Sequence, residues 1–276
     1  MVQVDAGVRL HVMEAGDDGG TSVVLLHGFP EFWYSWRHQL TALASAGFHA
    51  MAPDLRGYNV SDKPRGVDAY RLDVLARDVA RLLDGYGLER ASVVGHDWGA
   101  IVAWAFAMAY PDRLDRLCIL NVPHPLVSVR ALRSWQQIRK SWYVLFFQVP
   151  WLPEALARST SYAFVRAAMR QSFSVEDVDR YVEAIARPGA LAAGVNYYRA
   201  LVRHARANLR SVRRIDAPVL VIWGERDRYL GRELADPPRA WVPNVRIERL
   251  PNASHWVQQD EPARVNELLI EFLAGT

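Results

Sequence analysis

Short apolar runs alternate with longer amphipathic stretches along most of the chain. The runs are rich in β-branched residues and predict strands at residues 8–13, 22–26, 48–52, 91–94, 117–120, 218–223 and 245–250, with a helix over residues 36–46. Continuous apolar strands separated by helical stretches are typical of a parallel sheet covered on both faces. The pattern therefore predicts an α/β fold with a mostly parallel central sheet.

This alternation stops between residues 125 and 212. The stretch is rich in aromatic, arginine and helix-forming residues, and the strand pattern resumes only at Pro218. An open α/β sheet binds its ligand beyond the carboxyl ends of its strands. We therefore expect residues 125–212 to form a helical cap over that edge, between core segments 1–124 and 213–276. Ordinary crossover helices are the alternative.

Composition narrows the class of protein. The 276 residues are 51% hydrophobic and 23% charged, which suits one folded α/β domain with an insertion. The net charge is only +3, and the basic residues are spread along the chain, which argues against a nucleic-acid surface. The single cysteine, Cys118, lies in an apolar run and excludes both an internal disulfide and a cysteine-based zinc cluster.

Signals for export or membrane insertion are absent from the pattern. The first residues do not pair a basic segment with an apolar stretch. The longest apolar segment, residues 142–152, contains Gln148 and Pro150, is followed directly by Pro153, and is too short to cross a bilayer. We expect a cytoplasmic monomer or homodimer that needs no metal or cofactor and has no membrane or nucleic-acid partner.

The segment with the clearest chemical meaning spans residues 93–100, which read VVGHDWGA. An apolar strand passes through a turn into an alanine-rich helix, with small residues two positions before and after the centre, as in a nucleophile elbow. Asp97 occupies the centre, where serine is usual, beside a helix N-terminus that favours negative charge. The alternative is that Asp97 only caps the helix.

A carboxylate nucleophile suits attack on an sp³ carbon. Its reaction with an epoxide or a carbon–halogen bond gives a stable ester, whereas attack on an ordinary ester would give an anhydride. Hydrolysis of that ester requires a histidine base and a second carboxylate, which follow the nucleophile in this order in α/β-hydrolases. Asp227 and His255 follow the strands 218–223 and 245–250 and meet this requirement. Two other residues could supply the acid. Glu225 lies closer to the end of its strand than Asp227 does, and Asn121, which follows the strand 117–120, lacks the negative charge that stabilises the imidazolium.

The ester oxygen requires backbone N–H donors, which form an oxyanion hole. Trp98, directly after the nucleophile, is one expected donor, and Phe29 in the segment His27-Gly28-Phe29-Pro30 is the other. One such donor is worth about 2.7–4 kcal/mol of transition-state stabilisation. We expect the bond before Pro30 to be cis, because tight turns accommodate this isomer.

Five motifs together resemble those of the α/β-hydrolase-fold epoxide hydrolases. They are HGFPE at residues 27–31, DLRGY at 54–58, GHDWG at 95–99, GERD at 224–227 and SHW at 254–256. The resemblance covers essentially the whole chain. It implies an enzyme that converts an epoxide and water into a vicinal diol through an ester on Asp97.

The same resemblance implies two acidic tyrosines in the cap. The run Tyr143-Val144-Leu145-Phe146-Phe147-Gln148 matches one family motif and assigns this role to Tyr143, although Trp142 and Tyr162 leave its register open. The run Asn196-Tyr197-Tyr198-Arg199 matches the other and assigns it to Tyr198. Phe29, Trp33 and Trp98 are expected to line the pocket for a small apolar epoxide.

Two other functions use the same fold. Haloalkane dehalogenases share the aspartate nucleophile but hold the departing halide with two side-chain donors, commonly a tryptophan after the nucleophile and an asparagine after the first His-Gly. Trp98 fits this pattern, whereas Phe29 does not. A non-catalytic ligand receptor is the second alternative, and it would not need Asp97, Asp227 and His255 together.

Overall fold

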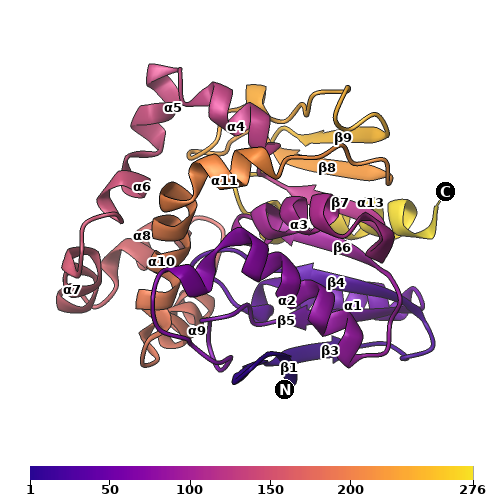
Figure 1. Cartoon of the computed structure of the whole chain (residues 1–276), viewed down its shortest axis with the longest axis horizontal. Coiled ribbons are helices and arrows are strands. Elements are labelled where there is room, and N and C mark those ends of the chain that lie inside the picture. Colours follow the sequence, from indigo (N-terminus) through magenta and orange to yellow (C-terminus); the bar gives the residue numbers. More distant parts are fainter. Residues whose placement is uncertain (276) are drawn as a thin grey trace.

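A seven-stranded sheet forms the centre of the computed structural model, which describes residues 1–275 (Figure 1). Its strand order is β3-β5-β4-β6-β7-β8-β9, and only the β3–β5 pair is antiparallel. The strands are β3 (Val12–Ala15), β4 (Thr21–Leu26), β5 (Phe48–Pro53), β6 (Ala91–His96), β7 (Leu114–Leu120), β8 (Val219–Gly224) and β9 (Val245–Leu250). This architecture confirms the predicted α/β fold.

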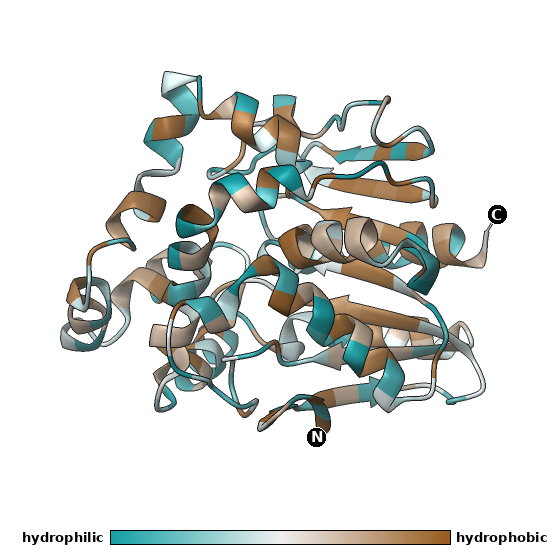
Figure 2. Cartoon of the chain, viewed as in Figure 1, coloured by the Kyte–Doolittle hydropathy of each residue, from teal (hydrophilic) through white to brown (hydrophobic). Residues whose placement is uncertain are grey.

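Alternate residues of each strand supply two hydrophobic cores, because successive side chains of a strand point to opposite faces. Val24 and Leu26 join the core beneath α2 (Leu72–Gly85) and α3 (Trp98–Ala109). Val23 and Leu25 join the core beneath α1 (Arg37–Ser45) and α13 (Pro262–Ala274). Figure 2 shows hydrophobic strands in the middle of the molecule and helices of mixed hydrophobic and hydrophilic residues around them. Cys118 is fully buried in the second core, as an apolar residue would be.

The predicted strand at residues 8–13 is wrong, because the chain forms two strands there. β2 (Val8–Leu10) pairs with β1 (Val2–Asp5) in a separate hairpin, whereas β3 pairs with β5. His11 interrupts the run, since its backbone bonds to the loop after β5: its N–H donates to Ser61 Oγ and its carbonyl accepts from Asp54 N–H. A distant loop therefore ends the strand.

Eight helices and no strand lie between β7 and β8 in this fully described part of the chain. They are α4 (Pro125–Ala131), α5 (Trp135–Lys140), α6 (Trp142–Phe146), α7 (Leu152–Ser159), α8 (Ala163–Met169), α9 (Val175–Ala186), α10 (Ala190–Arg203) and α11 (Ala205–Arg210). Figure 1 shows most of them gathered beyond one end of the sheet. We propose that residues 125–212 are the cap and that residues 1–124 and 213–275 form the core, while residue 276, which was assigned to the core by sequence, lies outside the described residues. The remaining short helices are η1 (Trp33–Trp36), η2 (Asp68–Tyr70), η3 (Pro111–Arg113), η4 (Arg232–Leu234) and α12 (Val257–Asp260).

Helix α10 illustrates how the cap is attached to the core. Leu191, Val195 and Tyr198 recur at helical spacing and are buried on one face. The neighbouring Tyr197 is fully buried, and its hydroxyl donates to the Arg56 carbonyl at 2.8 Å. Asp177 on α9 adds a second anchor through its ion pair with Arg37 on α1 at 2.9 Å. These contacts fix the inner face of the cap against the core. No helix within residues 1–275 is long and apolar enough to cross a membrane.

Candidate active site

Asp97 lies in a strained turn between β6 and α3. Its backbone has φ +48° and ψ −120°, a conformation that L-residues rarely adopt and that is typical of a nucleophile elbow. A Cβ on Gly99 would lie 2.0 Å from the Leu26 carbonyl oxygen, so the close packing of α3 on β4 requires glycine. The Asp97 side chain makes no capping hydrogen bond to α3. The simple capping interpretation therefore does not describe this residue.

The Asp97 carboxylate meets the loop that follows β4. The Phe29 N–H donates to Asp97 Oδ1 at 2.7 Å, and the Phe29–Pro30 peptide bond is cis, as expected. A Cβ on Gly28 would lie 2.5 Å from the Asp97 Cβ, which explains the glycine at this position. The Trp98 N–H belongs to the first residue of α3 and so lacks an acceptor within the helix. The two expected oxyanion donors thus flank Asp97, and Phe29 already contacts it.

His255 lies between two carboxylates. Its Nδ1 is 2.7 Å from Asp227 Oδ2, and its Nε2 is 3.6 Å from Asp97 Oδ2. Burial lowers the pKa of His255, but the charges and hydrogen bonds of Asp227 and Asp97 outweigh it and raise the pKa to about 10. Burial raises the pKa of Asp97, yet His255 more than compensates and lowers it below the ordinary value. The Asp97 side chain remains 18% exposed, so a small molecule can reach it.

Asp227 is held by donors on both of its oxygens. Its Oδ1 accepts from the Tyr229 and Leu230 N–H groups at 2.7 and 2.9 Å, and its Oδ2 accepts from Asn121 Nδ2 at 2.8 Å. These donors leave Oδ2 facing His255. Glu225, the sequence alternative, lies instead 3.8 Å from Arg249. Asn121, which lacks the charge to act as the acid itself, thus positions the Asp227 carboxylate.

Two buried residues, His96 and Glu31, support the site. His96 Nδ1 lies 3.0 Å from Glu31 Oε2, and His96 Nε2 lies 2.9 Å from the His255 carbonyl. Glu31 Oε2 also accepts the Gly28 N–H at 2.9 Å. Both nitrogens of His96 therefore lie within hydrogen-bond distance of an acceptor, and Glu31 Oε2 contacts both His96 and the Gly28 N–H. This buried pair links the loop of Phe29 to that of His255.

The two predicted tyrosines come together above this group. The rings of Tyr143 and Tyr198 lie 5.9 Å apart, and the Tyr198 ring contacts Phe29 at 5.6 Å and Trp98 at 4.9 Å. Burial, followed by the charge of Asp97, raises the pKa of both phenols, which keeps them protonated. Among the described residues, neither Tyr162 nor Trp142 makes a ring contact with Tyr198, and Trp142 is 62% exposed. The geometry thus favours Tyr143, rather than Trp142 or Tyr162, as the cap residue that acts together with Tyr198.

The remaining aromatic residues divide into two groups. Tyr229, which the sequence did not single out, packs 5.4 Å from His255 and 6.0 Å from Tyr143, and it belongs to the site. Trp33, predicted to line the pocket, instead pairs with Phe32 and Tyr34. Within the described chain, Trp33 makes no ring contact with Phe29 or either acidic tyrosine. The observed ring contacts of Trp33 are thus with its neighbours in the chain, and its place in the pocket stays a prediction.

Comparison with known proteins places this geometry in a family. A family model described as the alpha/beta hydrolase fold matches residues 21–262. Epoxide hydrolase 4 of Homo sapiens is 37% identical over 98% of this chain and 76% of its own length. An inhibitor complex of a Bacillus megaterium epoxide hydrolase superposes with a TM-score of 0.88 at 33% identity, covering 97% of both chains.

The chain belongs to the epoxide hydrolase family of the α/β-hydrolase fold. This membership confirms the resemblance that the five sequence motifs indicated. AB hydrolase superfamily protein YfhM of Bacillus subtilis (strain 168) is also similar, with 44% identity over 97% of this chain and 95% of its own length. That name gives only the superfamily.

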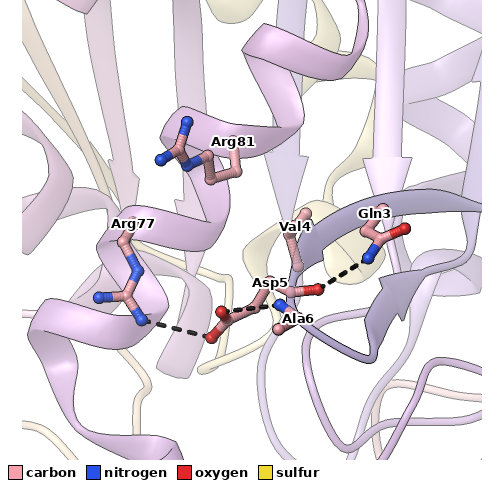
Figure 3. Close-up of a pocket in the computed structure, with 6 residues that line it drawn as sticks. All are labelled: Gln3, Val4, Asp5, Ala6, Arg77 and Arg81. Atoms are coloured by element: carbon pink, nitrogen blue, oxygen red, sulfur yellow. Dashed lines mark hydrogen bonds and ion pairs between the residues drawn. The ribbon is translucent and has the colours of Figure 1, made fainter.

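A surface hollow elsewhere has none of the predicted site residues. Gln3, Val4, Asp5, Ala6, Arg77 and Arg81 line it (Figure 3). Figure 3 shows the Arg77 guanidinium turned toward Asp5, with which it forms an ion pair at 3.3 Å. Arg81 pairs with Asp84 at 3.2 Å. Because both cations already have carboxylate partners, this hollow is a poor candidate for an anion site.

Proposed function

We propose that the protein hydrolyses an apolar epoxide to a vicinal diol through a covalent ester on Asp97. The observation that carries this proposal is the convergence of a carboxylate nucleophile with two protonated phenols, the half-buried Tyr143 and the buried Tyr198. The Tyr198 ring packs 5.6 Å from Phe29, whose N–H binds Asp97 at 2.7 Å. The names of the similar proteins support the same substrate class.

The two oxygens of Asp97 have different surroundings, which assigns them different roles in the first step. Oδ2 attacks an epoxide carbon, and the carbon–oxygen bond of the ring breaks. The departing oxygen takes a proton from Tyr143 or Tyr198. Oδ1 becomes the carbonyl oxygen of the ester and keeps its hydrogen bond from the Phe29 N–H. Phenols are suitable donors because an ordinary tyrosine has a pKa of about 10.

The second step hydrolyses the ester at Cγ of Asp97. His255 Nε2 takes a proton from water, and the resulting hydroxide attacks Cγ. The negative charge then develops on Oδ1, where the N–H groups of Phe29 and Trp98 stabilise it. The bond from Cγ to Oδ2 breaks, so Oδ2 leaves in the diol and the water oxygen stays on Asp97. His255 returns its proton to the departing alkoxide.

Esterification also prepares His255 for its role as base. In the free protein two carboxylates raise its pKa to about 10, which favours the imidazolium. The ester is neutral, so one of these two charges disappears when the first step is complete. The pKa of His255 then falls, and its proton can return to the tyrosine that lost one. The base thus becomes available at the step that needs it.

Trapping of the ester tests this proposal. His255→Gln should form the ester and hydrolyse it slowly, so mass spectrometry should detect the protein plus one epoxide, attached at Asp97. Asp97→Asn is the matched control and should form no adduct. A single turnover in ¹⁸O water should place the label in wild-type Asp97. Label that enters the diol directly, with an unmarked protein, contradicts the covalent mechanism.

The haloalkane dehalogenase alternative has less support. Phe29 has no polar side-chain atom for a halide, and its ring packs between Phe147 and Tyr198. Parallel assays of styrene oxide-like epoxides, aliphatic epoxides and haloalkanes distinguish the two activities. Halide release faster than diol formation would favour the dehalogenase.

A further inference from the structure

Exposed hydrophobic side chains are concentrated on one part of the cap. Six of the eight large hydrophobic side chains that are at least half exposed in the described chain lie between residues 132 and 156. These six are Leu132, Trp135, Trp142, Leu145, Trp151 and Leu156, and we call them the outer cap face. Trp135 and Trp151 are exposed by 72% and 73%. Monomeric proteins rarely leave apolar groups clustered on the surface unless they bind something.

The outer cap face lies on the side of the cap away from the sheet. Figure 1 shows α5, α6 and α7 along the outer edge of the molecule, beyond α8 and α10. Figure 2 shows hydrophobic segments on α6 and α7 at this edge. The side chains of the proposed active site point inward from the same region: Phe147 is buried, and Tyr143 packs against Tyr198. The segment therefore presents one apolar side to the active site and another to its surroundings.

The charges around the outer cap face have a single sign. Between residues 129 and 164 the basic side chains are Arg130, Arg133, Arg139, Lys140 and Arg158, and the only acidic one is Glu154. Glu154 is buried and pairs with Arg199 at 2.6 Å, so its charge is already compensated. None of the five basic side chains forms an ion pair within the described residues. The segment that carries the apolar surface therefore contributes five basic side chains without a carboxylate partner.

We propose that the outer cap face binds the surface of an anionic lipid bilayer. Tryptophan has an apolar body and a polar N–H, a combination suited to the boundary between headgroups and acyl chains. Basic side chains next to such residues are attracted to anionic headgroups. A second copy of this chain is a poorer occupant, because a symmetric contact would bring two sets of unpaired cations together. The sequence predicted no membrane partner, and this surface is visible only in the folded cap.

Vesicle sedimentation tests the proposal with the full chain. The vesicles contain phosphatidylcholine with about one third phosphatidylglycerol, and pure phosphatidylcholine is the comparison. The double variant Trp135→Ser/Trp151→Ser removes the two most exposed indoles, and Trp241→Ser, at a site 37% exposed on the core, is its control. The variant Arg133→Gln/Arg139→Gln removes two charges. Arg206→Gln/Arg210→Gln, on exposed α11, is its matched control.

We expect wild-type protein to bind the anionic vesicles, with weaker binding to pure phosphatidylcholine and at high salt. Each outer-face variant should bind about ten-fold more weakly or worse, while both controls bind as the wild type does. Thermal unfolding verifies that each variant is folded. If one of the two outer-face variants does not fold, the other still tests the proposal. Absence of wild-type binding, or equal effects of the controls, overturns the proposal. A concentration-dependent dimer that the outer-face variants abolish, without any change in vesicle binding, assigns the face to a second copy instead.

Discussion

Replacement of Asp227 by asparagine tests how the charge of this residue serves His255. Asp227 Oδ1 accepts two backbone N–H groups, and Oδ2 faces Asn121 Nδ2 and His255 Nδ1. In Asp227→Asn, the amide nitrogen would replace either Oδ1 or Oδ2, and in both positions its N–H groups would face other N–H donors. At the Oδ2 position it would favour the His255 tautomer that carries hydrogen on Nε2. That tautomer cannot take a proton from water at Nε2.

The size of the effect follows from the pKa of His255. Its rise from 6.5 to about 10 corresponds to about 5 kcal/mol in favour of the imidazolium. The charge and the hydrogen bond of Asp227 each raise the pKa more than those of Asp97 do, so Asp227 supplies more than half. Loss of this charge alone should cost at least about 2 kcal/mol, or a factor of about 30. The wrong tautomer extends the loss in ester hydrolysis to about 10⁴-fold.

Single-turnover kinetics with an epoxide separate the two steps. Alkylation of Asp97 needs the tyrosines rather than a basic His255, so Asp227→Asn should accumulate the ester, visible by mass spectrometry. Asp236→Asn is the control, since Asp236 is exposed and pairs with Arg249. Ester hydrolysis by Asp227→Asn within three-fold of the wild-type rate would refute the argument.

Three further predictions concern other parts of the molecule. Tyr143→Phe and Tyr198→Phe should each slow alkylation, the double variant by about 10²-fold or more, because the leaving oxygen loses its proton donors; an unchanged double variant contradicts their role. Burial lowers the pKa of His124 to about 4, so the unfolded protein binds more protons below pH 6.5, and stability should fall by about 3 kcal/mol between pH 6.5 and 4. Urea unfolding of His124→Gln should show a shallower pH dependence, and an identical slope refutes this. Gly99→Ala places a Cβ against the Leu26 backbone and should lower the free energy of unfolding by about 3 kcal/mol, whereas Gly19→Ala, in open space, should not.

The position of the three polar residues at one edge of the sheet could be predicted because the carboxyl ends of parallel strands lie at the same edge. Asp97, Asp227 and His255 each follow a different strand, and the carboxyl ends of such strands meet at one side of the sheet. The spacing of the glycines around Asp97 likewise reflects a local requirement, the close approach of α3 to β4. Both are properties of short segments together with a fold rule, so the sequence contains them.

Other parts of the site depend on residues that are remote in the chain. His96 contacts Glu31 across 65 positions, and Asn121 contacts Asp227 across 106. No local sequence pattern predicts a contact between residues so far apart in the chain. The same reason explains the wrong strand at residues 8–13, because Asp54 and Ser61 compete for the backbone of His11. The predicted place of Trp33 in the pocket stays a prediction, because its observed ring contacts are with Phe32 and Tyr34.

The sequence by itself therefore determined the α/β class, the nucleophile elbow and the positions of Asp97, Asp227 and His255 after three strands of the sheet. Only the tertiary structure decided which cap residues face the active site and which face outward. Tyr143 and Leu145 are two positions apart, yet the first packs against Tyr198 and the second is 66% exposed. A short helix shows apolar residues on more than one side, and only its packing against the other helices and the core determines which side is buried.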